Sequence, residues 1–214
     1  MLRELVLRKS VLRKLLLVFT LAAVAVCVVG SANAQSSIQV YGAWHCGNDF
    51  CTWSTVRNMT DFDTANHWMI DRGDGSGLPS VNLVVLSFVQ PLKLLDKTTD
   101  SGDSNGVPVG MNAAVVSYFT SHNVRVMLSI GGVTYTSYWD QALTQNATQL
   151  GLNAAALAKS LGVGIEIDYE NSSSPNIAGL QAFINAYRSQ LPYDATGANP
   201  AARLPSTWRQ ETGI

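Results

Sequence analysis

The sequence predicts an α/β fold built on a parallel sheet. Apolar runs alternate with segments of helical period in the order βαβαβαβα, with a repeat of about 42 residues. Such alternation is typical of parallel strands joined by helical crossovers. The run at residues 81–89 is apolar on both faces, as expected for a strand covered on both sides. A doubly wound sheet is the generic form of this arrangement.

The elements follow from hydrophobic period and from glycine, proline and capping residues. We expect strands at residues 38–44, 81–89, 124–130 and 162–170. We expect helices at about 61–71, 111–122 and 147–161, the second of them preceded by a Gly/Asp/Ser-rich loop at 100–106. A last helix is expected to open at Ser174-Pro175, where serine can cap and proline suits the first turn, and to run to Leu191.

The strand at residues 162–170 carries acidic side chains at every second position. Side chains alternate across a strand, so Glu166, Asp168 and Glu170 share one face while Ile165, Ile167 and Tyr169 share the other. Apolar flanks favour burial of this strand over a solvated sheet edge, which is the alternative. Buried like charges cannot all ionise, so at least one carboxyl is expected to keep its proton near neutral pH, as a general acid must.

Two segments resemble motifs of one enzyme family. Residues 162–170, G-V-G-I-E-I-D-Y-E, resemble the D-G-x-D-x-D-x-E signature of family 18 glycoside hydrolases, which include chitinases and endo-β-N-acetylglucosaminidases. Residues 126–132, V-M-L-S-I-G-G, resemble the S-x-G-G motif on that family's third strand. The chain departs from the signature at Val163, in place of its first Asp, and at Glu166, in place of its middle Asp.

The resemblance implies a (β/α)8 barrel of TIM type. It covers roughly residues 38–191, or about four βα units, whereas a barrel takes about 250 residues. We therefore expect residues 35–204 to form the N-terminal half of a family 18-like catalytic domain. Residues 205–214 are polar without a strand period, and we expect them to be an out-of-frame or non-native tail.

The same resemblance implies a reaction and its residues. Family 18 enzymes cleave β-1,4 bonds at N-acetylglucosamine with retention, the N-acetyl carbonyl of the substrate acting as nucleophile. Glu170 would be the general acid and then the base, Asp168 would orient the acetamido group, and Glu166 would take the role of the middle Asp. The implied partner is an N-acetylglucosamine-containing polysaccharide or glycan, and no cofactor or metal is implied.

Further residues are candidates for binding sugar at the carboxyl ends of the strands. Tyr41 and Trp44 are expected to end the first strand and Phe88 the second, where the family builds a sugar floor, although core packing explains them equally well. Three aromatic residues after the third strand could extend the cleft, with helix packing the simpler interpretation; they are Tyr135, Tyr138 and Trp139. The remaining candidates for substrate binding are Gly131, Gly132 and Tyr169; for both glycines and for Ser129, close backbone approach is the simpler role.

Two other functions remain open on sequence grounds. A barrel that binds chitin or another carbohydrate without hydrolysing it would fit the two departures from the signature, although the retained Glu170 argues against it. An unrelated secreted α/β binding protein would require both motif matches to be accidental.

The N-terminus has the pattern of a secretory signal peptide. Residues 1–14 carry five basic side chains, residues 15–30 are uncharged, and Ala32-Asn33-Ala34 suits cleavage after Ala34. We expect a secreted, extracellular or periplasmic protein without stable membrane association after cleavage; an uncleaved anchor is the alternative. The formal charge of the chain is −1, and nothing in its composition favours nucleic-acid binding.

We predict that Cys46 and Cys51 form a disulfide after export, because few residues separate them and the compartment is oxidising. Intact-mass analysis of the secreted protein with and without reductant checks this, and two alkylatable thiols in the unreduced protein would contradict it. A metal site is not expected, because metal binding would need more ligands nearby and His45 alone is weak evidence for one.

Overall fold

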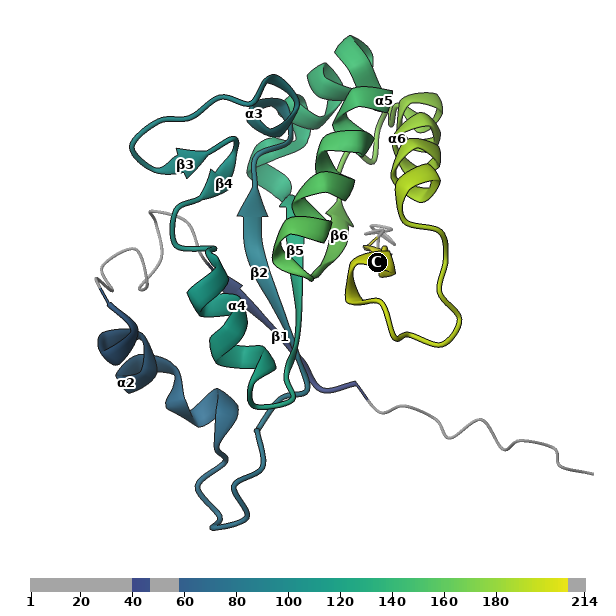
Figure 1. The fold of residues 1–214 in the computed structure, drawn as a ribbon. Helices are drawn as coiled ribbons and strands as arrows, with labels where there is room; N and C mark the ends of the chain where they lie inside the picture. Colours follow the sequence, from purple (N-terminus) through teal and green to yellow (C-terminus); the bar gives the residue numbers. More distant parts are fainter. Residues whose placement is uncertain (1–39, 47–57, 208–214) are drawn as a thin grey trace, which may run out of the picture. The chain divides into compact units, whose positions relative to one another are not determined.

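A computed structural model describes residues 40–46 and 58–207 of the chain (Figure 1). The expected signal peptide at residues 1–34 lies outside the described residues, and so does Cys51. The signal peptide and the Cys46–Cys51 disulfide therefore stay predictions.

The central element is one parallel sheet of five strands. Its strands are β1 (Gly42–Cys46), β2 (Leu83–Val89), β5 (Arg125–Gly131), β6 (Gly164–Asp168) and β7 (Ser206–Thr207). They lie side by side in the order in which they occur along the chain. A doubly wound sheet reverses its strand order at a switch point, so this generic arrangement is excluded for the described strands.

β7 corrects the expectation that residues after Leu204 contain no strand. Thr207 is the register partner of Asp168, and the carbonyls of Arg203 and Pro205 accept hydrogen bonds from Ile165 N (3.0 Å) and Ile167 N (3.1 Å). These bonds involve only main-chain groups, so a polar sequence can form them, and Pro205 contributes an acceptor without needing a donor. The sequence pattern failed because a short edge pairing requires no apolar alternation.

Helices connect the strands. They are α2 (Met59–Ile70), α3 (Pro91–Asp96), α4 (Ala113–Thr120), α5 (Thr136–Leu161) and α6 (Ile177–Gln190), with short 3-10 turns at Val133–Tyr135 and Pro200–Ala202. Asn58, Asn112 and Asn176 cap α2, α4 and α6 by accepting from backbone N–H groups. The expected opening of α6, with Ser174 as its cap, is thus wrong by two residues, because Asn176 is the cap. In the described part of the chain, no helix combines the length and apolarity that a membrane span needs.

The region between β2 and α4 contains elements that the sequence pattern did not predict. α3 starts at Pro91, and a hairpin follows it, formed by β3 (Asp103–Ser104) and β4 (Val107–Pro108). Lys93 Nζ of α3 donates to Asp100 Oδ2 (2.7 Å) and Asp103 Oδ2 (2.6 Å), which fixes the hairpin to the helix. These elements are too short to show a clear period.

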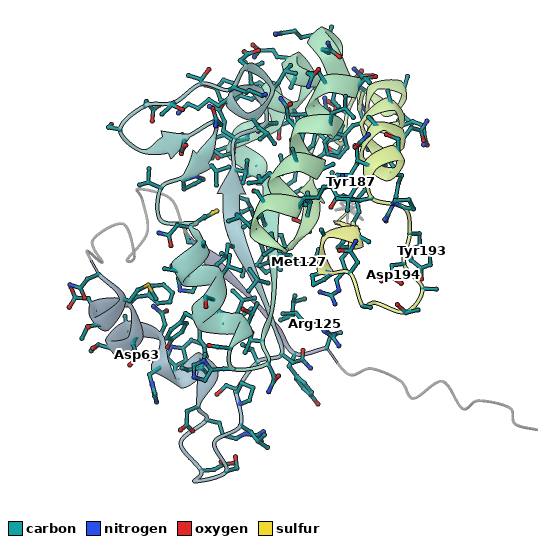
Figure 2. The ribbon with its side chains drawn as sticks, in the orientation of Figure 1. Asp63, Arg125, Met127, Tyr187, Tyr193 and Asp194 are labelled. Carbon is teal, nitrogen blue, oxygen red and sulfur yellow. The ribbon has the colours of Figure 1, made fainter. Side chains whose placement is uncertain are left out.

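The two faces of the sheet differ in chemistry. One face carries Leu86, Leu128, Ile130, Ile165 and Ile167, all buried in one apolar cluster with side chains from α4, α5 and α6. The opposite face carries Val85 and Met127, which are also buried (Figure 2 labels Met127). Burial of alternate residues on both faces confirms the interpretation of these strands as covered on both sides.

α5 and α6 pack closely at Gly151. A Cβ at this position would collide with the carbonyl oxygen of Phe183 on α6, so the contact requires a residue without a side chain. The hydroxyl of Tyr187 on α6 donates to the carbonyl oxygen of Ala201, which joins this helix to the segment leading into β7 (Figure 2).

α5 is interrupted at Asn146. The backbone there is non-helical (φ −164°, ψ 79°), and the Asn146 side chain accepts from Gln149 N at 3.0 Å as a new N-cap. The expected helix at 147–161 corresponds to the second segment. The first segment contains Tyr138 and Trp139, which were expected in a loop; Trp139 is fully buried, as the helix-packing interpretation required.

α2 and α4 are joined by polar contacts around Asp63 (labelled in Figure 2). Asp63 Oδ1 accepts from Tyr118 OH of α4 at 2.8 Å and contacts His67 Nδ1 at 2.9 Å. The hydrogen bond from His67, followed by that from Tyr118, lowers the pKa of Asp63. The hydrogen bond to Asp63 raises the pKa of His67, helped by the negative charges of Asp63 and Asp71.

We predict that Asp63→Asn lowers the pKa of His67 toward its ordinary value of 6.5, measured by NMR titration of the imidazole resonances. In the parent protein, the contact between His67 and Asp63 stabilises the fold. On the alkaline side this contribution is fully present below about pH 6.5 and is lost as pH rises through the raised pKa of His67. On the acid side it is lost as pH falls from 3.8 through the lowered pKa of Asp63.

The matched control is Asp74→Asn, which removes an exposed carboxylate hydrogen-bonded to Ser76 and leaves Asp63 intact. Equal His67 pKa values in the parent and in Asp63→Asn would show that Asp63 does not set the charge of this imidazole.

Candidate active site

The acidic strand is buried along its whole length. All five residues of β6 are buried, and the side chains of Glu166 and Asp168 are only 4% and 7% exposed. Ile165 and Ile167 lie in the apolar cluster under the helices, so strand alternation places Glu166 and Asp168 on the opposite face of the sheet. The predicted alternation is therefore confirmed, and the solvated sheet edge is wrong for these two carboxylates.

Ser129 is the neighbour of Glu166 across the sheet. The two residues are register partners on β5 and β6, and Ser129 Oγ donates to Glu166 Oε2 at 2.5 Å with both side chains buried. A buried carboxylate needs such donors to replace water. Ser129 was expected to permit close backbone approach, and its hydrogen bond to Glu166 was not predicted.

The carboxyl ends of β5 and β6 are held together by Trp139. Its indole Nε1 donates to Ile130 O and Asp168 O, each at 3.1 Å, and Gly132 N donates to the same Asp168 carbonyl at 3.0 Å. Gly131 has φ 121°, and a Cβ there would collide with Asp168 O and with the Trp139 indole. Gly131 therefore has a packing requirement that is independent of any substrate.

Glu170 lies two residues beyond β6, at the carboxyl end of the strand, and is half-buried. Within the described residues its side chain makes no hydrogen bond or ion pair. Its neighbours on both sides are anchored. Tyr169 OH donates to Asp140 Oδ1, and Asn171 Nδ2 donates to Asp140 Oδ2 at 2.9 Å. Glu170 thus extends from a fixed main chain while its carboxyl group is available for another contact.

Trp44 and Phe88 form an aromatic pair on the carboxylate face. Trp44 is in register with Val85 and Met127, which belong to that face, and its ring centroid lies 5.9 Å from that of Phe88. The Trp44 side chain is 50% exposed. A Cβ on Gly132, where φ is 91°, would lie 3.1 Å from the Phe88 ring, so Gly132 supports that ring closely. Trp44, Phe88 and Gly132 therefore lie together. Trp44 was expected to end the first strand, but it lies in the middle of β1.

Tyr41 does not join this group. It precedes β1, its carbonyl accepts from Asn82 N at 2.9 Å, and it is 62% exposed. It lines a cavity of about 700 Å³ together with Asn82 and Asn123, which precede β2 and β5. These positions are at the amino ends of the strands. β1 starts and ends later than the sequence pattern indicated, which places Tyr41 at the wrong end of the sheet for the expected role.

Tyr169 also departs from its expected role. Its ring lies 5.8 Å from that of Trp139, and its hydroxyl accepts from Asn176 N at 2.8 Å while donating to Asp140. Burial, followed by the hydrogen bond to Asp140, raises the pKa of the Tyr169 hydroxyl. The side chain is thus on the helix side of the sheet, and it holds the loop rather than facing the carboxylates.

Asp140 is the main residue that sequence reasoning missed. Its place in a segment expected to be a loop gave no signal, because only the helical start of α5 brings it beside Tyr169 and Asn171.

A second cavity, of about 470 Å³, lies between β4 and the C-terminal part of α5 and is lined by residues such as Val107 and Leu157. In the ranges 40–46 and 58–207, no three His, Cys, Asp or Glu side chains gather as metal ligands would.

Glu170 is a half-buried carboxyl group that can exchange a proton with a bound molecule, and Asp168 and Glu166 precede it on the adjoining strand. Comparison with known proteins adds little sequence support, because neither a protein-family model nor a curated protein matches the chain.

Among solved structures, the chain is similar to a crystal structure of a chitinase from Rhizomucor miehei, with 15% sequence identity and a TM-score of 0.47. The likeness covers 78% of this chain and 56% of the chitinase, so the chain spans little more than half the length of that protein. The strands and helices described above define the fold of the chain.

We predict that Ser129→Ala lowers the free energy of unfolding by about 1–3 kcal/mol, because it removes the hydrogen bond that Ser129 Oγ donates to the buried Glu166 carboxylate. Urea unfolding followed by circular dichroism measures it. Ser160→Ala is the matched control, since Ser160 Oγ donates to a main-chain carbonyl in an exposed position. Equal, small effects of the two substitutions would mean that the Ser129–Glu166 contact contributes little.

Proposed function

We propose that the protein is a secreted glycoside hydrolase that cleaves β-1,4 bonds at N-acetylglucosamine, in chitin or a related glycan. The observation that carries the proposal is the set of carboxyl groups at positions 166, 168 and 170, which leads from a buried strand to the carboxyl end of a parallel sheet. This edge is where (β/α)8 barrels place their active sites.

The proposal includes a barrel of which this chain supplies about four βα units. Strand starts at residues 42, 83, 125, 164 and 206 give a nearly constant spacing, and the strand order follows the chain. Sequential parallel strands joined by crossovers of one hand put their helices on one face, as a barrel requires. The described sheet has β1 and β7 at its two edges, so closure of a barrel belongs to the proposal.

Glu170 has the central role in the proposed reaction. As a protonated acid it gives its proton to the glycosidic oxygen while the bond from the anomeric carbon to that oxygen breaks. The N-acetyl carbonyl oxygen of the same sugar attacks the anomeric carbon and forms an oxazolinium ion. Water then attacks this carbon, Glu170 takes the proton from water, and the product keeps its configuration. Partial exposure of Glu170 allows its carboxyl group to reach a bound sugar.

Asp168 and Glu166 have supporting roles. Asp168 would orient the acetamido group and stabilise the positive charge that develops on it. Glu166 would act on Asp168 from the next position on the same face. Its side chain is one methylene longer than the Asp of the family signature, and the hydrogen bond from Ser129 fixes its carboxylate.

Trp44 and Phe88 would form the sugar floor. Pyranose rings have apolar C–H faces that pack on aromatic rings, and the exposed half of Trp44 offers such a surface next to Phe88. This contact is shared by an enzyme and by a carbohydrate-binding protein. Binding without hydrolysis is therefore the second candidate function, favoured by the replacement of the middle Asp of the signature by Glu166.

We predict that Glu170→Gln lowers the rate of hydrolysis of chitooligosaccharides or of a chitobiose core by about 10²–10⁴-fold, because the amide cannot donate an acidic proton. Hydrolysis is measured on the full-length gene product by separation of the released sugars. Asp96→Asn, an exposed change of the same chemical type, is the control and should leave the rate unchanged.

A Glu170→Gln protein as active as the parent would refute the role of Glu170. If the parent binds these sugars in calorimetry and never releases product, the carbohydrate-binding function is correct instead.

A further inference from the structure

We propose that Asp140 is a positioning residue that holds the main chain of Glu170 from both sides. This inference rests on the proposed function, in which Glu170 is the acid. Asp140 binds Tyr169 and Asn171, the two neighbours of Glu170, so its effect on the reaction would pass through the loop that it binds.

The two oxygens of Asp140 are divided between the two neighbours of Glu170. Oδ1 accepts from the hydroxyl of Tyr169, and Oδ2 accepts from Nδ2 of Asn171 at 2.9 Å. Both bonds are charge-assisted, because the acceptor is a carboxylate. With residues 169 and 171 fixed to one carboxyl group, the Cα of Glu170 has little freedom to move.

Both donors are committed to further contacts in the same loop. The Tyr169 hydroxyl, which donates to Asp140, accepts from Asn176 N at 2.8 Å at the cap of α6. Asn171 Nδ2 also donates to Ser174 O at 3.2 Å, and Asn171 Oδ1 accepts from Ser174 N at 3.0 Å. Asp140 is therefore the central acceptor of a network that closes the whole segment 169–176.

Asp140 is itself held in place by its neighbour in the helix. Trp139 is fully buried and its indole donates to Ile130 O and Asp168 O. Two consecutive residues at the start of α5 thus fix residues 168–171, which contain both Asp168 and Glu170. This arrangement would set the distance between the two carboxyl groups that the reaction uses.

The geometry makes the effect of an isosteric change specific. In Asp140→Asn one oxygen remains to accept from Tyr169, while the new amide NH2 faces the NH2 group of Asn171. Turning over the Asn171 amide would relieve this clash of donors but would lose the bonds from Ser174 N and from Ser173 Oγ, which now lies at 3.2 Å. The Asn variant should therefore keep one arm of the clamp and lose the other.

The first measurement is hydrogen exchange of backbone amides, which does not depend on activity. In Asp140→Ala we expect exchange in the segment 169–176 to rise at least about tenfold, with a smaller rise in Asp140→Asn. Asp96→Ala is the matched control. It removes an aspartate that accepts from Gln145 Nε2 at an exposed site, and it should leave this segment unchanged.

The second measurement is steady-state hydrolysis by the same variants of the full-length gene product. We expect kcat to fall by about 10²-fold in Asp140→Ala with KM nearly unchanged, because a displaced acid impairs the reacting geometry and leaves sugar binding intact. Asp140→Asn should retain part of kcat. A role in stability alone would lower Tm and leave kcat of the folded protein at the parent value.

The outcomes separate this inference from the proposed function. If Glu170→Gln is fully active, or if the parent has no activity, the proposed function fails and exchange alone decides whether Asp140 holds the loop. If Asp140→Ala does not fold, Asp140→Asn and Tyr169→Phe, each lacking one arm, replace it. Unchanged exchange in 169–176 in both single-arm variants, or a parental kcat in both, would overturn the inference.

Discussion

The described fold depends on one indole N–H group that is shared by two strand ends. Trp139 Nε1 lies 3.1 Å from both Ile130 O and Asp168 O, where β5 and β6 leave the sheet. A buried main-chain carbonyl needs a donor. Asp168 O accepts from Gly132 N at 3.0 Å, and the indole adds a second donor that connects the two strand ends. The bond requires a glycine at position 131 and fixes the start of α5 against the sheet.

The sheet next to Trp139 separates an apolar layer on the helix side from buried carboxyl groups on the opposite face. On the helix side, Trp139 packs against Phe183 and Tyr169 in an apolar layer, with ring centroids 5.5 and 5.8 Å away. On the other side, Glu166 is buried beside Ser129. A sheet that separates an apolar layer from buried carboxylates must satisfy each polar group individually, since hydration cannot do so. The hydrogen bond from Ser129 to Glu166 satisfies one of these polar groups, and it joins two residues that are register partners on neighbouring strands.

The sequence predicted the strands that have a repeating hydrophobic pattern, and it missed the short elements and single contacts that depend on a few residues. Strand period gave the four longer strands and the face shared by Glu166 and Asp168, because alternation leaves a signal in every second residue. It misplaced Tyr41, since a shift of a few residues at the end of a strand moves a side chain from one edge of the sheet to the other. α3, the β3–β4 hairpin and β7 are too short for a period. Asp140 was missed because its contacts lie 29 to 31 residues away in sequence.

The break of α5 at Asn146 separates two helical segments that make different contacts. The first segment carries Trp139 and Asp140, which contact the residues around Asp168 and Glu170. The second segment contributes Gly151 to the contact with α6 and Leu150 to the core. Phe183 of α6 contacts both segments, since its carbonyl oxygen lies against Gly151 and its ring centroid lies 5.5 Å from that of Trp139. Substitutions at Gly151 can therefore reach the residues around Glu170 through α6, although the helix itself is interrupted between them.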